Sequence, residues 1–247
     1  MTENTMSRSD KDRFLRETPL LDYSAPSIQR LVRLRQWRDL PPFSRVQAVY
    51  NYVRDEILFG YNADDSIPAS EVLADGYGQC NTKATLFMAL LRACGVPCRV
   101  HGFMIHKRLQ KGAMTGVVYR SAPEYILHSW VEVLLEDTWY QLEGLILDRA
   151  YLQKLQSAHP ECTGAFCGYG AAVKDLQHPV IDFDRNHTYI QSEGICQDLG
   201  LYDCPDDLLK EHRQELSPAK AFLYRHWGRH LMNWNIAGLR NKYYFGN

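Results

Sequence analysis

The chain has 247 residues, of which 45% are hydrophobic and 12% aromatic. This is enough apolar material for one sizeable core, or for one core with an appended subdomain, and it excludes a disordered protein. The formal net charge is −1, so the chain has no excess of positive charge. We therefore expect neither nucleic acid nor an anionic membrane surface as a partner.

The N-terminal residues and the cysteines both favour a cytoplasmic protein. Residues 1–25 are polar, contain no apolar signal-peptide core, and are expected to form a flexible arm. No later stretch reaches the ~18 apolar residues of a membrane span. The seven cysteines are odd in number and unevenly spaced. They are therefore expected to be mostly free thiols in a reducing compartment.

The first half of the chain is predicted to be mainly helical. Apolar residues recur at helical spacing in three segments, 27–40, 44–57 and 69–75. A segment with two glycines then precedes the strongest predicted helix, which begins at Cys80 and stops at Gly95. Apolar side chains occupy most of its faces, so we expect this helix to be buried.

Beyond Gly95 the pattern changes to alternation, which predicts strands. The expected strands are 98–105, 126–135, 138–142 and 187–191, and the expected further helices are 148–158, 205–216 and 218–232. Glu136 and Asp137 form the predicted hairpin turn between the second and third of these strands. This organisation predicts a core domain over 26–158 and a C-terminal extension over 159–247 that packs on the core.

Cys80 has the local setting of a nucleophile. It follows Gly76-Tyr77-Gly78-Gln79 and opens the buried helix, where the positive end of the helix dipole favours thiolate over thiol. The unpartnered N–H groups of a first helical turn can also stabilise an oxyanion. The same pattern is equally typical of a small buried cysteine at a helix start. This segment by itself leaves both interpretations open.

A histidine and a carboxylate are predicted to meet on the adjoining hairpin. Alternation places His128, Trp130 and Glu132 on one face of their strand. If the hairpin pairs residue 135 with residue 138, His128 and Glu143 become diagonal neighbours roughly 7–8 Å apart at Cα. Glu143 could then hold one imidazole nitrogen while the other accepts a thiol proton. An odd-numbered turn would remove this pairing unless a bulge restored the register.

Three segments, in this order, resemble the transglutaminase-like superfamily. They are Gly78-Gln79-Cys80 with the helix that follows, His128-Ser129-Trp130-Val131-Glu132-Val133, and Trp139-Tyr140-Gln141-Leu142-Glu143. The resemblance covers about residues 45–150, and its specificity comes from three motifs in order with matching gaps. It implies an α+β fold of the papain-like, transglutaminase-like cysteine protease type, with the nucleophile helix packed on an antiparallel sheet. Small bacterial members are the closer comparison, and residues 26–158 would form the catalytic core.

The resemblance implies a triad of Cys80, His128 and a carboxylate. The superfamily usually has Asp where this chain has Glu143, which is one methylene longer, so Asp148 is a reserve candidate for the third position. The chain is too short for the accessory β-domains of the large calcium-dependent animal transglutaminases. It also contains no Asp-x-Asp-x-Asp-Gly calcium loop.

Further residues are weaker candidates for binding. Gln79, Tyr61 and Trp130 could contact the substrate or an oxyanion, although aromatic residues on strands are more often core. Cys162 and Cys167 could hold zinc with two of His159, His178 and Cys196, or form a reversible disulfide, but their spacing matches no established zinc pattern. We therefore expect no metal and no cofactor.

The predicted function is thiol-dependent acyl transfer through a thioacyl-enzyme, with a peptide, protein or small-molecule amide as substrate. Hydrolysis by a cysteine peptidase or amidase is favoured, because transfer to an amine requires a dedicated route that excludes water. A transglutaminase or amide synthase is one alternative, and a catalytically silent binding module of the same fold is another. Residues 159–247 could form a lid, a partner surface or a structural layer.

Overall fold

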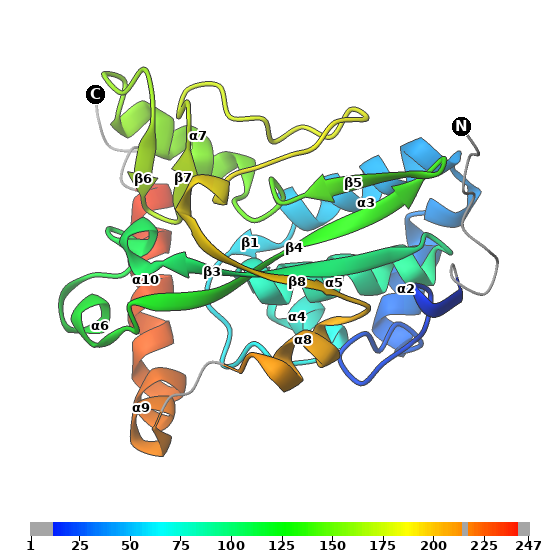
Figure 1. Ribbon diagram of the computed structural model, residues 1–247, viewed down its shortest axis with the longest axis horizontal. Coiled ribbons are helices and arrows are strands. Elements are labelled where there is room, and N and C mark those ends of the chain that lie inside the picture. The colour runs from blue at the N-terminus through cyan, green and yellow to red at the C-terminus, as the bar shows by residue number, and fades with distance from the viewer. Residues whose placement is uncertain (1–11, 214–216, 242–247) are drawn as a thin grey trace.

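The centre of the protein is one helix packed against a four-stranded sheet. The structure, a computed structural model, describes residues 12–213 and 217–241. Helix α5 (Cys80–Ala93) packs against β3 (Cys98–His106) and β4 (Tyr125–Leu135). With β5 (Thr138–Leu142) and β8 (Ile195–Tyr202), these strands form an antiparallel sheet in the order β5-β4-β3-β8 (Figure 1). This arrangement confirms the predicted α+β fold.

The other elements surround this centre. Around α5 lie α2 (Pro26–Leu34), α3 (Pro42–Asp55) and α4 (Ala69–Asp75), and α8 (Pro205–Glu211) contacts β3 and β8. Two short two-stranded sheets pair β1 (Leu58–Phe59) with β2 (Tyr77–Gly78), and β6 (Phe166–Gly168) with β7 (Ala171–Val173). The remaining helices are α6 (Gly116–Ser121), α7 (Arg149–Ala158), α9 (Pro218–Leu223) and α10 (Arg229–Asn241), with a π-helical turn over Tyr224–Gly228 and 3₁₀ turns over Trp37–Asp39, Lys107–Gln110 and Ser192–Gly194.

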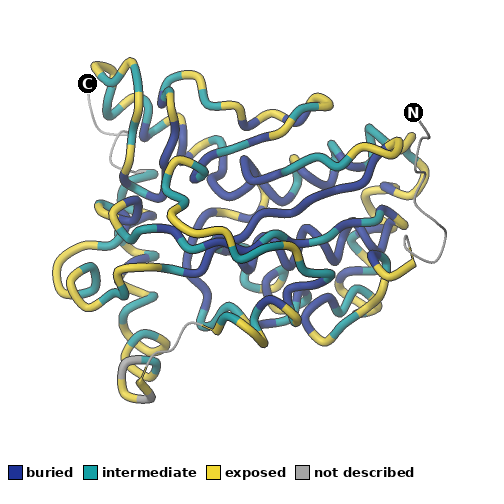
Figure 2. Tube along the Cα trace, in the orientation of Figure 1, coloured by how far each residue is buried: buried dark blue, intermediate teal, exposed yellow. Residues whose placement is uncertain are grey.

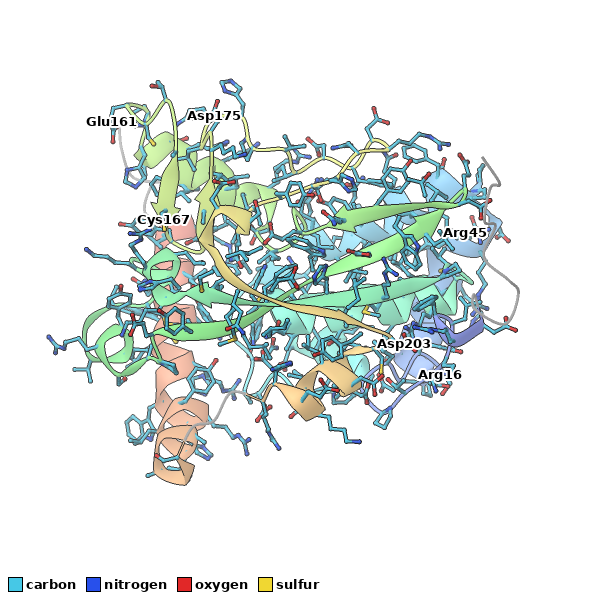
Figure 3. All side chains as sticks on the ribbon, viewed as in Figure 1. Arg16, Arg45, Glu161, Cys167, Asp175 and Asp203 are labelled. Atoms are coloured by element: carbon cyan, nitrogen blue, oxygen red, sulfur yellow. The ribbon has the colours of Figure 1, made fainter. Side chains whose placement is uncertain are left out.

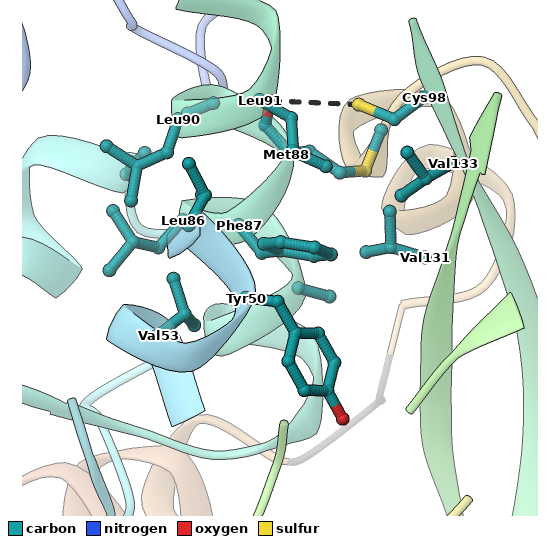
Figure 4. Packing of buried hydrophobic residues seen from close by; sticks show 14 of the residues in the cluster. Tyr50, Val53, Leu86, Phe87, Met88, Leu90, Leu91, Cys98, Val131 and Val133 are labelled. Carbon is teal, nitrogen blue, oxygen red and sulfur yellow. Dashed lines mark hydrogen bonds between the residues drawn. The ribbon is translucent and has the colours of Figure 1, made fainter. Parts of the chain in front are cut away.

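Helix α5 is buried at every one of its positions, as the sequence predicted (Figure 2). Its apolar residues meet Val131 and Val133 of β4 on one side and Tyr50 of α3 on the other (Figure 4). Gly95 ends the helix in the left-handed conformation, with φ of 74°. The amide of the next residue, Val96, donates to the carbonyl oxygen of Leu91 at 2.9 Å, so the end of the helix is capped.

The hairpin between β4 and β5 has the even-numbered pairing that the site requires. Leu135 pairs with Thr138, and the register continues without a bulge to the pair Val131–Leu142. Glu136 and Asp137 both have positive φ, 50° and 60°. Two such residues in a two-residue loop form the turn whose twist matches that of the strands. This confirms the register predicted for the hairpin.

The structure differs from expectation near both ends of the chain. Residues 12–25 do not form a flexible arm, because Phe14 and Leu21 are buried in the core, while residues 1–11 lie outside the described residues. Residues 187–191 form no strand, only a bridge from Thr188 to Leu142. Strand β8 was not predicted, although it completes the sheet from within the supposed extension 159–247. Its polar residues and Gly200 hide the alternation typical of a strand.

Several helices also have bounds that differ from the predicted ones. The first helix ends at Leu34 rather than at residue 40, and the two late helices become α8, α9 and α10 with a π-helical turn between the last two.

Among the described residues, no helix has both the length and the apolar content needed to cross a membrane.

Removing the Phe87 side chain should test the central packing. Phe87 is fully buried and stacks edge-on against Tyr50, with ring centroids 5.9 Å apart. Phe87→Ala is expected to lower the free energy of unfolding by about 3–5 kcal/mol, measured by urea denaturation, because a large cavity is left. Leu34→Ala is the control, since Leu34 is 71% exposed. A loss below about 1 kcal/mol for Phe87→Ala would mean that this contact is not central.

Candidate active site

Cys80 is the first residue of α5 and is only 6% exposed. The chain approaches the helix closely here, because a Cβ on Gly78 would lie 2.7 Å from the Thr82 hydroxyl and 2.9 Å from the Lys83 side chain. The backbone N–H of Gln79, the residue before the helix, donates to that same Thr82 hydroxyl at 3.1 Å and so has a hydrogen-bond partner. Glycine at 78 thus lets the backbone deliver Cys80 to the start of α5.

A polar network holds the start of α5 to the loop before it. The Gln79 side chain accepts from the Asn62 amide at 2.8 Å and donates to Asp65 at 2.8 Å. Asn81 donates to the other Asp65 oxygen at 3.0 Å, and Ser129 of β4 donates to Asn81 at 2.9 Å. Burial raises the pKa of Asp65, although these two amide donors oppose the change. The network fixes the start of α5 relative to β4, the strand that bears His128.

His128 and Glu143 form a fully buried pair. His128 Nε2 lies 2.7 Å from Glu143 Oε1, and both side chains have no exposed area. The second carboxylate oxygen, Oε2, accepts the backbone amides of Ile190 at 2.8 Å and Gln191 at 3.0 Å. Glu143 also donates its own backbone amide to the Thr188 carbonyl at 3.0 Å. The extra methylene of Glu143 is therefore accommodated by a segment that binds both ends of the residue.

The second ring nitrogen of His128 has no partner among the described residues, and Cys80 is a neighbour of the ring. Nδ1 is buried and, within the described residues, has no partner in hydrogen-bonding geometry. Burial disfavours the protonated ring, but the neighbouring Cys80 and Glu143 outweigh it and raise the pKa of His128 from 6.5 to about 10. Both neighbours thus favour an imidazolium. The structure brings together Cys80, His128 and Glu143, with one ring nitrogen bound to the carboxylate and the other without a partner in the described residues.

The reserve carboxylate, Asp148, has a different position. Its side chain caps α7 by accepting the Tyr151 amide at 2.9 Å, and it also accepts the Phe59 amide at 2.9 Å. Arg240 of α10 forms an ion pair with it. Burial opposes ionisation, but these contacts hold the pKa of Asp148 below its usual value. Asp148 therefore serves the packing of α7 and α10, and Glu143 is the carboxylate that reaches His128.

The three predicted substrate or oxyanion contacts differ in what their polar atoms already bind. Both polar atoms of the Gln79 amide are engaged in the loop network. The Tyr61 hydroxyl donates to Gln110 at 2.6 Å. Burial raises the pKa of Tyr61 well above its usual value, and the proximity of Cys80 adds to this effect. Trp130 Nε1 is buried and has no partner in the described part of the chain. Of the three, Trp130 is the residue whose polar atom has no partner at all within the described residues.

The remaining cysteines do not gather into a metal site. All seven cysteines lie in the described ranges, and none is in a disulfide. Cys162 lies near the carbonyls of Gly164 and Ala165, and Cys167 is exposed near the end of the molecule that holds β6 and β7 (Figure 3). Across residues 12–213 and 217–241, no group of three or more His, Cys, Asp or Glu side chains is placed to hold a metal ion.

Several residues that build the site were not singled out from the sequence. The amides of Ile190 and Gln191 act through the backbone, so no side-chain motif marks them. Lys83 could have been identified from the sequence, because it is a charged residue within a helix that is predicted to be buried and is largely apolar. A buried charge requires partners and therefore predicts a built contact.

Replacing the Glu143 carboxylate by an amide should change the titration of His128. Because Glu143 favours the imidazolium, Glu143→Gln is expected to lower the pKa of His128 below its wild-type value of about 10. The measurement is an NMR titration of the histidine rings. Glu132→Gln is the matched control, since Glu132 lies on the same strand and contacts His101 at 3.2 Å. It should lower the pKa of His101 and leave that of His128 unchanged. An unchanged His128 in Glu143→Gln would show that the pair does not control the ring.

We compared the chain with curated proteins, solved structures and protein families. No curated protein matches the sequence. Solved structures that resemble the chain include a proposed cysteine protease from Cytophaga hutchinsonii, with 13% identity and a TM-score of 0.47, covering 82% of this chain and 50% of the other. The periplasmic domain of TgpA from Pseudomonas aeruginosa has 20% identity and a TM-score of 0.38, with coverages of 64% and 50%. Red sea bream transglutaminase has 16% identity and a TM-score of 0.31, with coverages of 89% and 32%.

The chain thus spans half of each of the first two of these proteins and a smaller share of the third. The family match is more specific, because it is made to the sequence itself. Residues 33–144, which include Cys80, His128 and Glu143, match the family described as the transglutaminase-like superfamily. This confirms the resemblance seen in the three sequence motifs. Residues 33–144 are thus the part of the chain that is similar to the transglutaminase-like superfamily.

Proposed function

We propose that this chain is a thiol-dependent acyl-transfer enzyme with Cys80 as nucleophile, His128 as general base and acid, and Glu143 as the carboxylate that orients His128. One observation carries the proposal. His128 is held through Nε2 by a buried carboxylate, while Nδ1 has no hydrogen-bond partner within the described residues and lies in the vicinity of a cysteine at a helix N-terminus. That arrangement is what an activated thiol requires.

In the proposed reaction, His128 Nδ1 accepts the proton of the Cys80 thiol, and Sγ adds to the carbonyl carbon of an amide. The developing oxyanion is stabilised by amides of the first turn of α5 and by Trp130 Nε1. His128 then returns the proton to the leaving nitrogen as the C–N bond breaks, which leaves a thioacyl-enzyme. Water adds to this thioester with loss of its proton to His128. The C–S bond then breaks, His128 returns the proton to Sγ, and the carboxylic acid leaves while the Cys80 thiol is regenerated.

We propose water as the acceptor, which makes the enzyme a peptidase or amidase. If an amine reaches the thioester first, the same residues catalyse amide transfer. The two reactions differ only in which nucleophile enters after acylation. They can be distinguished with p-nitrophenyl acetate as acyl donor and methylamine as competing acceptor, with Cys80→Ala as the background control. Acetate as the main product supports the hydrolase, and enzyme-dependent N-methylacetamide supports the transferase.

Alkylation of Cys80 should report the thiolate–imidazolium pair directly. Iodoacetamide is expected to label Cys80 well below pH 7, ahead of the other six cysteines, because His128 accepts its proton. His128→Ala should remove this low-pH reactivity. The labelled residue is located by peptide mass spectrometry across a pH series. The control is His101→Ala, which replaces a histidine of the adjacent strand β3 that pairs with Glu132 and Asp198.

Two results would contradict the proposal. Cys80 could react only near the free-thiol pKa of about 8.5, or it could stay unlabelled with and without His128. Either result would favour the silent binding module over the enzyme.

Trp130 can be tested separately from the thiolate. Trp130→Phe removes the unpartnered donor but keeps an aromatic ring among Phe103, His101 and Tyr189. Acylation by p-nitrophenyl acetate is expected to slow by roughly 10²-fold, the typical effect of losing one oxyanion donor. Alkylation by iodoacetamide should not change, since that reaction forms no oxyanion. The control is Tyr61→Phe, because the Tyr61 hydroxyl is already bonded to Gln110. Equal effects of Trp130→Phe on both reactions would exclude the oxyanion role.

A further inference from the structure

Helix α5 is buried throughout, yet it carries two cations, Lys83 and Arg92. Lys83 has no exposed area at all. Taking an ammonium out of water is costly, and burial lowers the pKa of Lys83 from 10.5 to about 7. The Asp148 and Asp55 carboxylates favour its charge, while Arg240 and Arg54 oppose it. A buried cation of this kind has to be compensated by close partners.

Three backbone carbonyls are those partners. Lys83 Nζ donates to the carbonyl oxygens of Ile57 at 2.7 Å, Arg54 at 3.1 Å and Ile146 at 3.1 Å. A protonated lysine has three N–H donors, so this set uses all of them. The acceptors come from two separate stretches of chain. Arg54 and Ile57 lie between the end of α3 and the start of β1, and Ile146 lies in the turn after β5.

The third acceptor links Lys83 to the proposed triad. Ile146 closes a turn on Glu143, because its amide donates to the Glu143 carbonyl at 3.1 Å. Lys83 lies three residues after Cys80, about one helical turn away. One ammonium therefore joins the turn of helix that presents Cys80 to the turn of chain that presents Glu143.

We propose that Lys83 is a positioning residue, which sets the distance between the nucleophile helix and the carboxylate that orients His128. This inference rests on the proposed function of Cys80, His128 and Glu143. Without the ammonium, the Ile146 carbonyl loses its bond to α5, and the turn is free to shift. A shift of the Glu143 carboxylate misplaces the His128 ring, and displacements of about 1 Å can cost up to 10²-fold in rate.

Arg92 offers a matched control on the same helix. It is also buried, and its guanidinium donates to the backbone carbonyls of Arg16 at 2.6 Å, of Cys98 at 2.9 Å and of Asp203. Arg16 and Asp203 lie together at one end of the molecule (Figure 3). By the helical rise, Arg92 is about 18 Å along the axis from Cys80. It makes the same kind of contact as Lys83, but far from the triad.

The test compares Lys83→Met with Arg92→Met. Both variants are expected to lower the free energy of unfolding in urea, because each leaves buried carbonyls without donors. The rate of Cys80 alkylation at pH 6 is then measured on folded protein. We expect it to fall by roughly tenfold or more in Lys83→Met, and to stay within about twofold of wild type in Arg92→Met. The NMR titration should also show a lowered pKa for His128 in Lys83→Met only.

Equal alkylation rates in the two variants, or a wild-type rate in Lys83→Met, would overturn the positioning role. Should Lys83→Met fail to fold, Lys83→Gln, which keeps two donors, is judged by the same criteria. If the proposed function itself is wrong, the result differs, because wild-type Cys80 then lacks reactivity at low pH. The proposed role of Lys83 would then also be wrong. If wild-type Cys80 is reactive and Lys83→Met is unchanged, only the role of Lys83 is lost.

Discussion

The buried carboxylate of Glu143 is the group on which the arrangement of the site depends. A carboxylate without exposed area is strongly unfavourable unless each oxygen has partners. One oxygen contacts the His128 ring, and the other accepts the amides of Ile190 and Gln191. These contacts require the segment at 188–191 to pass beside the end of β5, although it is more than 40 residues away along the chain. Compensation of a single charge thus links the hairpin, the histidine and a distant segment.

This dependence explains why the C-terminal third is not a separate layer. Strand β8 pairs with β3 and completes the sheet. Asn233 of α10 binds both the backbone amide and the carbonyl of Tyr61. Arg240 further pairs with Asp148. The predicted C-terminal extension 159–247 therefore supplies a strand of the central sheet and two backbone amides that bind Glu143. Removal of residues 159–247 would take away the amides that bind Glu143.

The two buried cations of α5 also require compensation of their charge, as the Glu143 carboxylate does, but their partners are acceptors rather than donors. Lys83 and Arg92 each bind backbone carbonyls rather than carboxylates. Carbonyl oxygens at chain turns have no partner within a helix or sheet, so a buried cation satisfies them while they stabilise its charge. Each cation joins elements that apolar packing alone holds less specifically. In α5, apolar side chains supply the bulk of the burial, and the charged residues determine which chain segments lie against the helix.

The sequence was sufficient to predict the buried helix that begins at Cys80, the β4–β5 hairpin, and Cys80, His128 and Glu143 as candidate site residues. These features follow from local periodicity, from turn chemistry at Glu136 and Asp137, and from motif order, all of which depend on residues near in sequence. Local pattern could not decide between Glu143 and Asp148, because both are carboxylates close to the end of a strand. The contacts in the folded protein distinguish the two carboxylates. Asp148 binds α7 and Arg240, whereas Glu143 binds His128 and the backbone amides of residues 190 and 191. Backbone groups carry no side-chain signature, and the contacts they make between distant segments are set by the fold as a whole.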